Sequence, residues 1–152
     1  MDASVALGVV GTVSGLSGLA IALYQTRLSR RAATLQVILD LHRSYQSAEM
    51  RATRGKIYRR EYGDYADLPL SDQEDIRNLL NLLELLGTLV DERIADFHVV
   101  HSLWRKSPRP IWYALVDSWV KHQREAGIPT PQPDYAQNFE RLVKRYEQER
   151  RP

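Results

Sequence analysis

The stretch IRNLLNLLELLGTLV, residues 76–90, decides the fold that this sequence encodes. Its apolar residues cover most of the circumference of a helix with about 3.6 residues per turn, which predicts a helix buried on nearly every side. We therefore expect it to form the centre of an all-α bundle. Polar residues recur along it at intervals of four and three and form one narrow stripe, namely Arg77, Asn81, Glu84, Thr88 and Asp91.

A helix start signal precedes this stretch. Ser71-Asp72-Gln73-Glu74 has the form of a capping box, with serine at the cap and glutamate three positions later. It predicts that the central helix begins at Ser71. Residues 62–70, YGDYADLPL, contain Gly, Asp and Pro and therefore predict a loop.

Other segments have the apolar periodicity of helices and predict a helical domain over residues 27–149, with a tail at 150–152. Asp96 and Asp134 stand at N-cap positions before two of these segments. Alternating strand patterns and internal repeats are absent from the sequence, so we expect an all-α bundle of about five helices. Helical segments are predicted at residues 48–61, from Ser71 through the leucine-rich run 76–90, at 97–106, at 110–127, and after Asp134 up to the fraying tail EQERRP.

Residues 5–24, VALGVVGTVSGLSGLAIALY, are a second decisive segment. With their neighbours they make 24 uncharged residues from Ala3 to Thr26. As a helix this length spans about 36 Å, more than a hydrocarbon core of about 30 Å. We expect a transmembrane signal-anchor helix over residues 1–26, which continues past Arg31 into the helical bundle.

Two other interpretations of this segment stay open. Residues 20–22, Ala-Ile-Ala, have the small-x-small form of a cleavage site, and the segment could also be a buried helix of a soluble protein. The chain begins with acidic Asp2, and its first arginines follow the apolar run, which is the reverse of a signal peptide. This charge distribution favours an anchor in the cell membrane, with the N-terminus outside and residues 27–152 in the cytoplasm.

Small residues in the apolar segment recur at intervals of three and four, which places them on one helix face. Gly11 and Gly15 form a GxxxG step, where two helix backbones can approach closely. We expect this face to be a helix–helix interface, in a homo-oligomer or with the span of a membrane-protein partner. Its members are Gly8, Gly11, Gly15, Gly18 and Ala22.

Charge is unevenly distributed after the apolar segment. Residues 27–60 contain nine Lys or Arg and two acids, whereas residues 61–100 contain ten acids and two arginines. The basic block can face anionic lipid headgroups or pair with the acidic block, and both interpretations stay open. Nucleic-acid binding is disfavoured because the block directly follows a membrane span. The candidate headgroup contacts are Arg27, Arg30 and Arg31.

The sequence carries no recognisable catalytic or cofactor motif. It has no cysteine, which excludes disulfides and thiolate chemistry, and no glycine-rich phosphate loop. Asp96, His98 and His101 come closest to a metal site, but no motif supplies the further ligands, and Asp96 suits an N-cap better. We therefore expect no enzyme activity, cofactor, metal ion or small-molecule substrate.

Glu84 is the remaining candidate for catalysis. A carboxylate within a leucine-rich helix could act as a general base or a proton relay. Its place on the polar stripe favours instead a structural ion pair with a basic residue of a neighbouring helix. The candidate partners are Arg51, Arg54 and Arg59.

The segment LLNLLELLGTLVDERIADFHVVHSLW, residues 79–104, carries a scattered pattern of Asn81, Glu84, Gly87, Leu89, Val90 and Trp104. Together with the N-terminal span and the basic exit helix, this pattern resembles a widespread bacterial family of small single-pass membrane proteins. Members of that family carry a helical domain of unknown function. The resemblance implies the same architecture and a bacterial or phage origin, and it implies neither an activity nor site residues.

These features predict a non-enzymatic, membrane-anchored interaction or scaffold module that presents a cytoplasmic bundle to a protein partner. The alternative is a membrane-active effector whose assembled spans permeabilise the bilayer when the bundle senses a trigger. Thr12, Ser14 and Ser17 within the apolar segment motivate this alternative, because their hydroxyl groups could line a pore.

Overall fold

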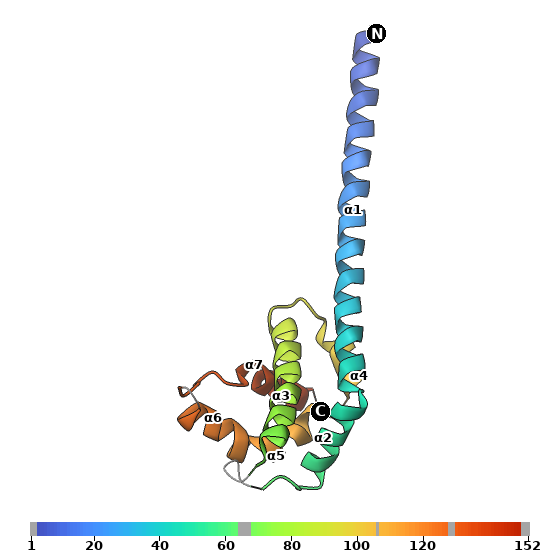
Figure 1. Cartoon of the computed structure of the whole chain (residues 1–152). Coiled ribbons are helices and arrows are strands. Elements are labelled where there is room, and N and C mark those ends of the chain that lie inside the picture. The colour runs from blue at the N-terminus through green and yellow to red at the C-terminus, as the bar shows by residue number, and fades with distance from the viewer. Residues whose placement is uncertain (1–2, 64–67, 106, 128–129, 150–152) are drawn as a thin grey trace. The chain divides into compact units, whose positions relative to one another are not determined.

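The structure, a computed structural model, describes residues 3–63, 68–105, 107–127 and 130–149. Within these ranges every regular element is a helix and none is a strand, so the predicted all-α class is confirmed (Figure 1). Contacts divide the chain into two compact units, Met1–Val37 and Ile38–Pro152.

The first unit consists of the N-terminal part of α1, and α1 itself is one continuous helix, Ala3–Tyr45. The expected continuation of the helix past Arg31 is therefore confirmed. Side chains of residues 22–37 are exposed, with Thr34 half-buried. The Thr34 hydroxyl donates a hydrogen bond of 3.0 Å to the carbonyl oxygen one turn earlier, so it is satisfied within its own helix.

The predicted membrane span covers residues 1–26, and between residues 3 and 21 only the course of the helix is described. In the described part of the chain, no helix is both long and apolar enough to cross a membrane. Ala22 of the predicted interface is exposed. The other members of that interface lie outside the residues whose side chains are described, namely Gly8, Gly11, Gly15 and Gly18.

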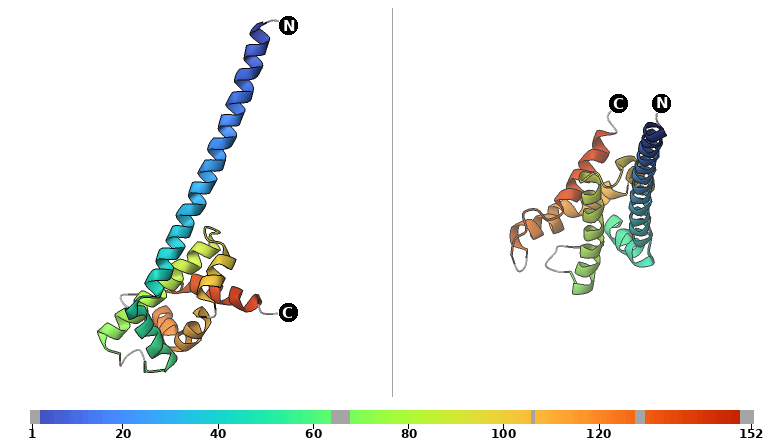
Figure 2. Two further views of the ribbon diagram at one scale, coloured as in Figure 1. Left: turned by 90° about the vertical axis from the view of Figure 1, so that its right-hand side faces the viewer. Right: turned by 90° about the horizontal axis from the view of Figure 1, so that it is seen from above.

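The second unit is a helical bundle that includes the last turns of α1 (Figures 1 and 2). As the sequence predicts, α3 is its centre, because buried side chains line most of this helix and α7 packs along it more extensively than any other element. The elements that follow α1 are α2 (Ala48–Tyr58), α3 (Leu70–Asp91), α4 (Phe97–Trp104), α5 (Pro108–Leu115), the π-helical turn η2 (Val116–Val120), α6 (Lys121–Ala126) and α7 (Gln137–Gln148).

The start of α3 differs from the prediction. The helix begins at Leu70 with Pro69 at the cap, and no side chain caps it, so the capping box predicted at Ser71 is wrong. The carbonyl oxygen of Pro69 already accepts the amide of Gln73 at 3.0 Å, which places Ser71 inside the first turn. The Gln73 side chain donates instead to the carbonyl oxygen of Leu68 at 2.9 Å.

The N-cap predicted at Asp134 is also wrong, whereas the one at Asp96 is confirmed. Asp96 accepts the amide of His98 at 2.7 Å and caps α4. α7 begins only at Gln137, because Ala136 has a left-handed backbone with φ 58° that separates the helix from Asp134. No side chain from its own segment caps α7.

The single helix predicted over residues 110–127 is interrupted by the π turn. Pro108, rather than Pro110, occupies the first helical position, which its fixed φ angle favours. The wider π turn changes which residues face the core after it, and both Trp119 and Val120 are buried there. No residue type signals such a turn in the sequence.

The C-terminal end of α1 is fixed in the core of the second unit by aromatic packing and by Arg54. Trp104 packs against the rings of His42 and Tyr45, with centroid distances of 5.0 and 6.2 Å. The buried guanidinium of Arg54 donates to the carbonyl oxygen of Tyr45 and lies 3.7 Å from the centroid of the Tyr45 ring. Arg54 thus satisfies a carbonyl group that the helix end leaves without an intrahelical partner. Burial also raises the pKa of the Tyr45 phenol.

Gly87 permits the closest approach between α3 and α7. A Cβ atom at this position would lie 2.4 Å from the carbonyl oxygen of Asn138 and 2.5 Å from its carbonyl carbon. These atoms belong to the backbone of α7 and cannot move aside as a flexible side chain would. Glycine is therefore required at position 87 by the packing of the two helices.

We expect Gly87→Ala to lower the free energy of unfolding by about 1–3 kcal/mol, because the added methyl group overpacks the helix contact. The measurement is urea unfolding of the full chain, followed by tryptophan fluorescence. All three tryptophans lie in the second unit, so this signal reports on the bundle.

Gly55→Ala is the matched control. Its Cβ would meet only the side chain of Arg59, at 3.1 Å, and alanine favours a helix over glycine by about 1 kcal/mol. This variant should be as stable as the wild type or more stable. Equal effects of the two substitutions would contradict the requirement for glycine at position 87.

Candidate functional site

The polar stripe predicted on α3 divides into two parts. Arg77 and Asn81 are exposed on the N-terminal half of the helix. Glu84 and Thr88 are half-buried, and their side chains contact the first turn of α7. Asp91, the last member of the stripe, also contacts α7, through an ion pair of 2.7 Å with Arg141. The structure therefore brings the C-terminal half of the stripe together with another element.

Glu84 caps the N-terminus of α7 from a different helix. Its Oε1 accepts the amide of Asn138 at 3.1 Å, and its Oε2 accepts the amide of Phe139 at 2.8 Å. The first amides of a helix have no intrahelical acceptor, and a negative charge near them also interacts favourably with the helix dipole. Glu84 thus supplies the cap that the residues before α7 do not provide.

A second contact extends this cap. The Thr88 hydroxyl donates to the carbonyl oxygen of Glu84 at 2.9 Å and accepts the Asn138 side-chain amide at 3.0 Å. Asn138 is therefore held through both its backbone and its side chain. Its role could not be predicted from the sequence, because position 138 lies 54 residues from Glu84 and interacts through an amide that almost every residue has.

The expectation that Glu84 pairs with an arginine is wrong. Arg54 bonds to the carbonyl oxygen of Tyr45, and Arg59 forms an ion pair with Glu61. Backbone amides occupy both carboxylate oxygens of Glu84. In this arrangement the carboxylate accepts two hydrogen bonds as a structural cap.

The structure adds Glu149 to the two histidines that the sequence singled out. His98 Nδ1 lies 3.2 Å from one carboxylate oxygen of Glu149, and His101 Nε2 lies 3.8 Å from the other. The His101 ring also packs on Tyr146, with 4.8 Å between ring centroids. Asp96, the third predicted member, caps α4. Among the described residues, no group of His, Asp or Glu side chains is arranged to hold a metal ion.

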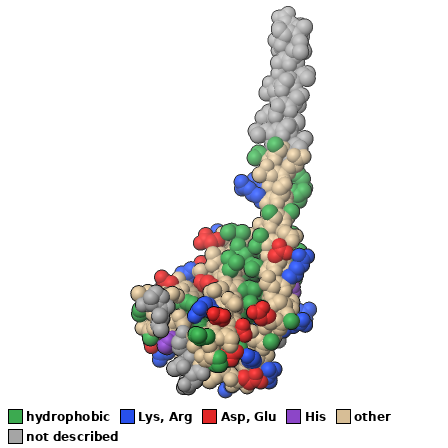
Figure 3. All heavy atoms as spheres, viewed as in Figure 1, with side chains coloured by type: hydrophobic (Ala, Val, Ile, Leu, Met, Phe, Trp, Pro, Cys, Tyr) green, Lys and Arg blue, Asp and Glu red, His purple; other side chains and the backbone are tan. Residues whose placement is uncertain are grey.

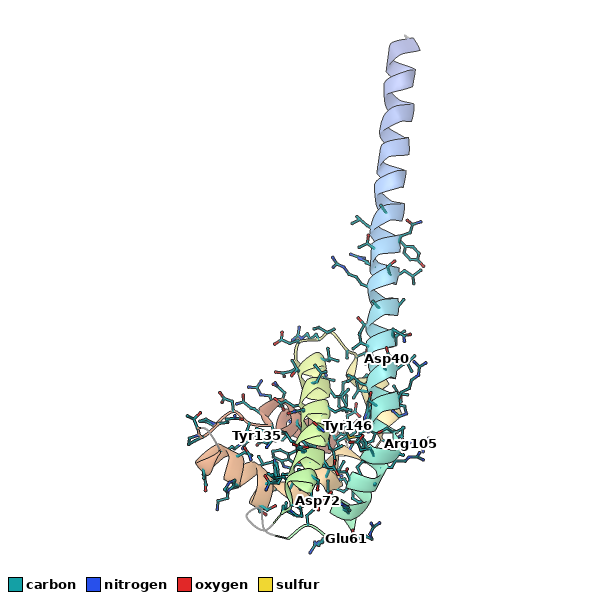
Figure 4. The ribbon with its side chains drawn as sticks, viewed as in Figure 1. Asp40, Glu61, Asp72, Arg105, Tyr135 and Tyr146 are labelled. Carbon is teal, nitrogen blue, oxygen red and sulfur yellow. The ribbon has the colours of Figure 1, made fainter. Side chains whose placement is uncertain are left out.

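Part of the basic block pairs with the acidic block inside the second unit. Lys56 and Asp72 form an ion pair of 2.7 Å between α2 and α3, and this hydrogen bond raises the pKa of the Lys56 ammonium group. Figure 4 shows Asp72 at the start of α3 and Glu61 just after the end of α2, where Glu61 pairs with Arg59. Intramolecular pairing therefore accounts for Lys56 and Arg59 of the basic block.

The arginines at the start of the block belong to the first unit. Arg27, Arg30 and Arg31 are exposed on α1, and Figure 3 shows basic side chains on the described part of this helix. Within the described residues they form no ion pair with the acidic block. They are thus available to an external anionic group, in contrast to Lys56 and Arg59.

We expect Glu84→Gln to lower the free energy of unfolding by about 1–2 kcal/mol. The glutamine side chain keeps one acceptor oxygen, but its NH₂ group faces the other of the two backbone amides that Glu84 caps, and the negative charge is lost. Urea unfolding of the full chain measures the loss. Glu125→Gln, which neutralises an exposed carboxylate on α6, is the control and should change the stability by less than about 0.5 kcal/mol. The capping role of Glu84 is contradicted if the two variants are equally stable.

Comparison with known proteins supplies a family but no characterised relative. No curated protein and no solved structure matches the chain. A family model described as a domain of unknown function, DUF4760, matches residues 12–146. The matched region begins within the apolar segment 5–24 and contains the Glu84 cap together with its partners on α7. The chain therefore belongs to the family of the domain of unknown function DUF4760.

Proposed function

We propose that this protein is a membrane-anchored interaction or scaffold module, which self-associates or pairs with a membrane partner through a glycine-rich transmembrane face. The anchor is the segment from Ala3 to Thr26, which holds no charged residue and belongs to the single helix α1. The bundle formed by the second unit is the part that it presents to a protein partner. We infer no substrate, nucleic acid or cofactor for it.

The spacing of glycines in the anchor carries this proposal. Four glycines in one helix cost about 1 kcal/mol each relative to alanine in water, so they need a compensating role. In a bilayer, small residues on one face allow two helices to approach closely and gain packing contacts. Gly8, Gly11, Gly15 and Gly18 are spaced to form such a face, and Ala22 continues it.

The exposed arginines after the anchor support the proposed orientation. Arg27, Arg30 and Arg31 follow the apolar segment directly, and positively charged flanks are retained on the cytoplasmic side of a membrane. In that position they also contact anionic headgroups, each with about 1 kcal/mol of favourable interaction. The proposed location is the cell membrane, with a single pass and a cytoplasmic C-terminal bundle.

We expect Gly11→Leu/Gly15→Leu to weaken self-association about tenfold, which corresponds to about 1.4 kcal/mol. The leucine side chains would hold the two backbones apart at the GxxxG step. Energy transfer between tagged copies of the full chain, measured in membranes at matched expression, reports the change.

Val13→Leu is the matched control, because Val13 lies off the glycine face of the same helix. It should leave the energy transfer unchanged. If the double glycine variant associates as the wild type does, the glycine face is not the interface. If Val13→Leu weakens association equally, the effect is not specific to that face.

A single introduced cysteine tests the orientation, because the native chain has none. Ser102→Cys places a thiol at an exposed position of α4. We expect an impermeant maleimide to label it only after the cells are lysed. With Arg27, Arg30 and Arg31 all replaced by Gln, a fraction of the chains should become labelled in intact cells, because the positive flank is lost. Labelling of Ser102→Cys in intact cells without these replacements would contradict a cytoplasmic bundle.

A membrane-active effector is the second candidate function. Thr12, Ser14 and Ser17 place hydroxyl groups in the proposed span, which would suit a pore formed by several assembled helices. Growth arrest on overexpression that disappears when residues 1–26 are deleted favours this candidate. A scaffold would be tolerated at the same level of expression.

A further inference from the structure

A cavity of about 370 Å³ lies where the end of α2, the start of α3 and the π turn η2 meet. Its volume is in the lower part of the range of about 300–1,000 Å³ in which proteins hold small molecules. Figure 4 shows Glu61 and Asp72 at this end of the second unit. Four apolar side chains that are almost completely buried line it, namely Ile57, Ile76, Leu115 and Trp119.

Two side chains of opposite charge also line this cavity. Arg60 follows α2, and Asp117 lies in the π turn. Both are exposed, and within the described part of the chain neither forms an ion pair or a side-chain hydrogen bond. A lone exposed charge is ordinary at a protein surface. A cation and an anion that border one apolar cavity are complementary to a small zwitterion with an apolar body.

Arg60 occupies a backbone position where glycine is usual. Its φ angle is 55°, and its amide donates to the carbonyl oxygen of Ile57 at 3.0 Å in the turn that ends α2. A left-handed conformation costs an L-residue about 1–2 kcal/mol. Arg93 and Arg105 share a positive φ, so the conformation alone does not mark a site. What distinguishes Arg60 is that it lines a cavity with an apolar floor.

Neutral hydrogen-bonding groups complete the lining. Ser118 lies beside Asp117 in the π turn, and π turns often accompany functional sites. Tyr62 lines the cavity from the segment after α2, and burial raises the pKa of its phenol. The phenol is therefore protonated at neutral pH and can donate a hydrogen bond.

We propose that this cavity binds a small amphipathic zwitterion of the size of a free α-amino acid with a large apolar side chain. Arg60 would hold the carboxylate, Asp117 the ammonium group, and the apolar floor around Ile76 the side chain. Binding here gives the bundle a soluble ligand to sense, and it does not depend on the membrane anchor or on the glycine face.

The first test uses L-leucine and two derivatives with the purified full chain. N-acetyl-L-leucine lacks the ammonium group, and L-leucinamide lacks the carboxylate. Titration is followed by the melting temperature and by the tryptophan fluorescence of the chain, to which Trp119 in the cavity lining contributes. L-Leucine should bind and raise the melting temperature, and each derivative should bind about tenfold more weakly. Absence of L-leucine binding at about 10 mM, well above a millimolar Kd, overturns the proposal, and so does equal binding of all three compounds.

The second test assigns the two charges. Arg60→Gln should weaken the binding of L-leucine about tenfold and leave the binding of L-leucinamide unchanged, because L-leucinamide has no carboxylate for Arg60 to bind. Asp117→Asn should weaken the binding of L-leucine to a similar extent and leave the binding of N-acetyl-L-leucine unchanged. Arg93→Gln removes an arginine with the same backbone conformation that does not line the cavity, and it should bind L-leucine as the wild type does. A loss of L-leucine binding in Arg93→Gln equal to that in Arg60→Gln overturns the assignment, as does unchanged binding in Arg60→Gln.

Discussion

The bundle depends on one contact, in which the carboxylate of Glu84 on α3 accepts the first amides of α7. This contact requires that the two helices approach closely, and Gly87, one turn further along α3, provides the space. The Glu84 cap depends on Gly87, because a side chain at position 87 would push the backbone of Asn138 away from Glu84. Burial of Phe139 and Leu142 against the core follows from that placement of α7.

The C-terminus of α1 is also capped by a charged side chain from another helix. Arg54 satisfies the last carbonyl group of α1, as Glu84 satisfies the first amides of α7. In each case a charged side chain from another helix supplies the partner that the helix end lacks, and the sign of the charge matches the helix dipole. The helix ends are therefore fixed by tertiary contacts, which makes their positions depend on the packed bundle.

This dependence explains how much of the structure the sequence could predict. Periodicity identified the central helix α3, because burial on nearly all sides leaves a clear apolar pattern. Local caps were predicted correctly only where no other element intervened, as at Asp96. The N-caps predicted at Ser71 and Asp134 were wrong, because Pro69 and the left-handed Ala136 determine where the two helices begin. The role of Asn138 was missed, because it contacts Glu84 through a backbone amide, which no residue type signals. Of the candidate sites, the sequence marked Glu84 and the histidines, but it could not place Arg60 near Asp117, 57 positions away along the chain.

The polar side chains of this chain differ in whether the protein itself supplies their hydrogen-bond or ion-pair partners. Glu84, Thr88 and Arg54 each form hydrogen bonds that hold one helix end of the bundle in place. Within the described residues, Arg60 and Asp117 at one cavity, and the arginines that follow the apolar segment, have no such internal partner. Exposed charges contribute little to stability, so the fold alone does not explain why Arg60 and Asp117 border one apolar cavity. The two proposals for external partners, at the cavity beside η2 and along α1, rest on these charges.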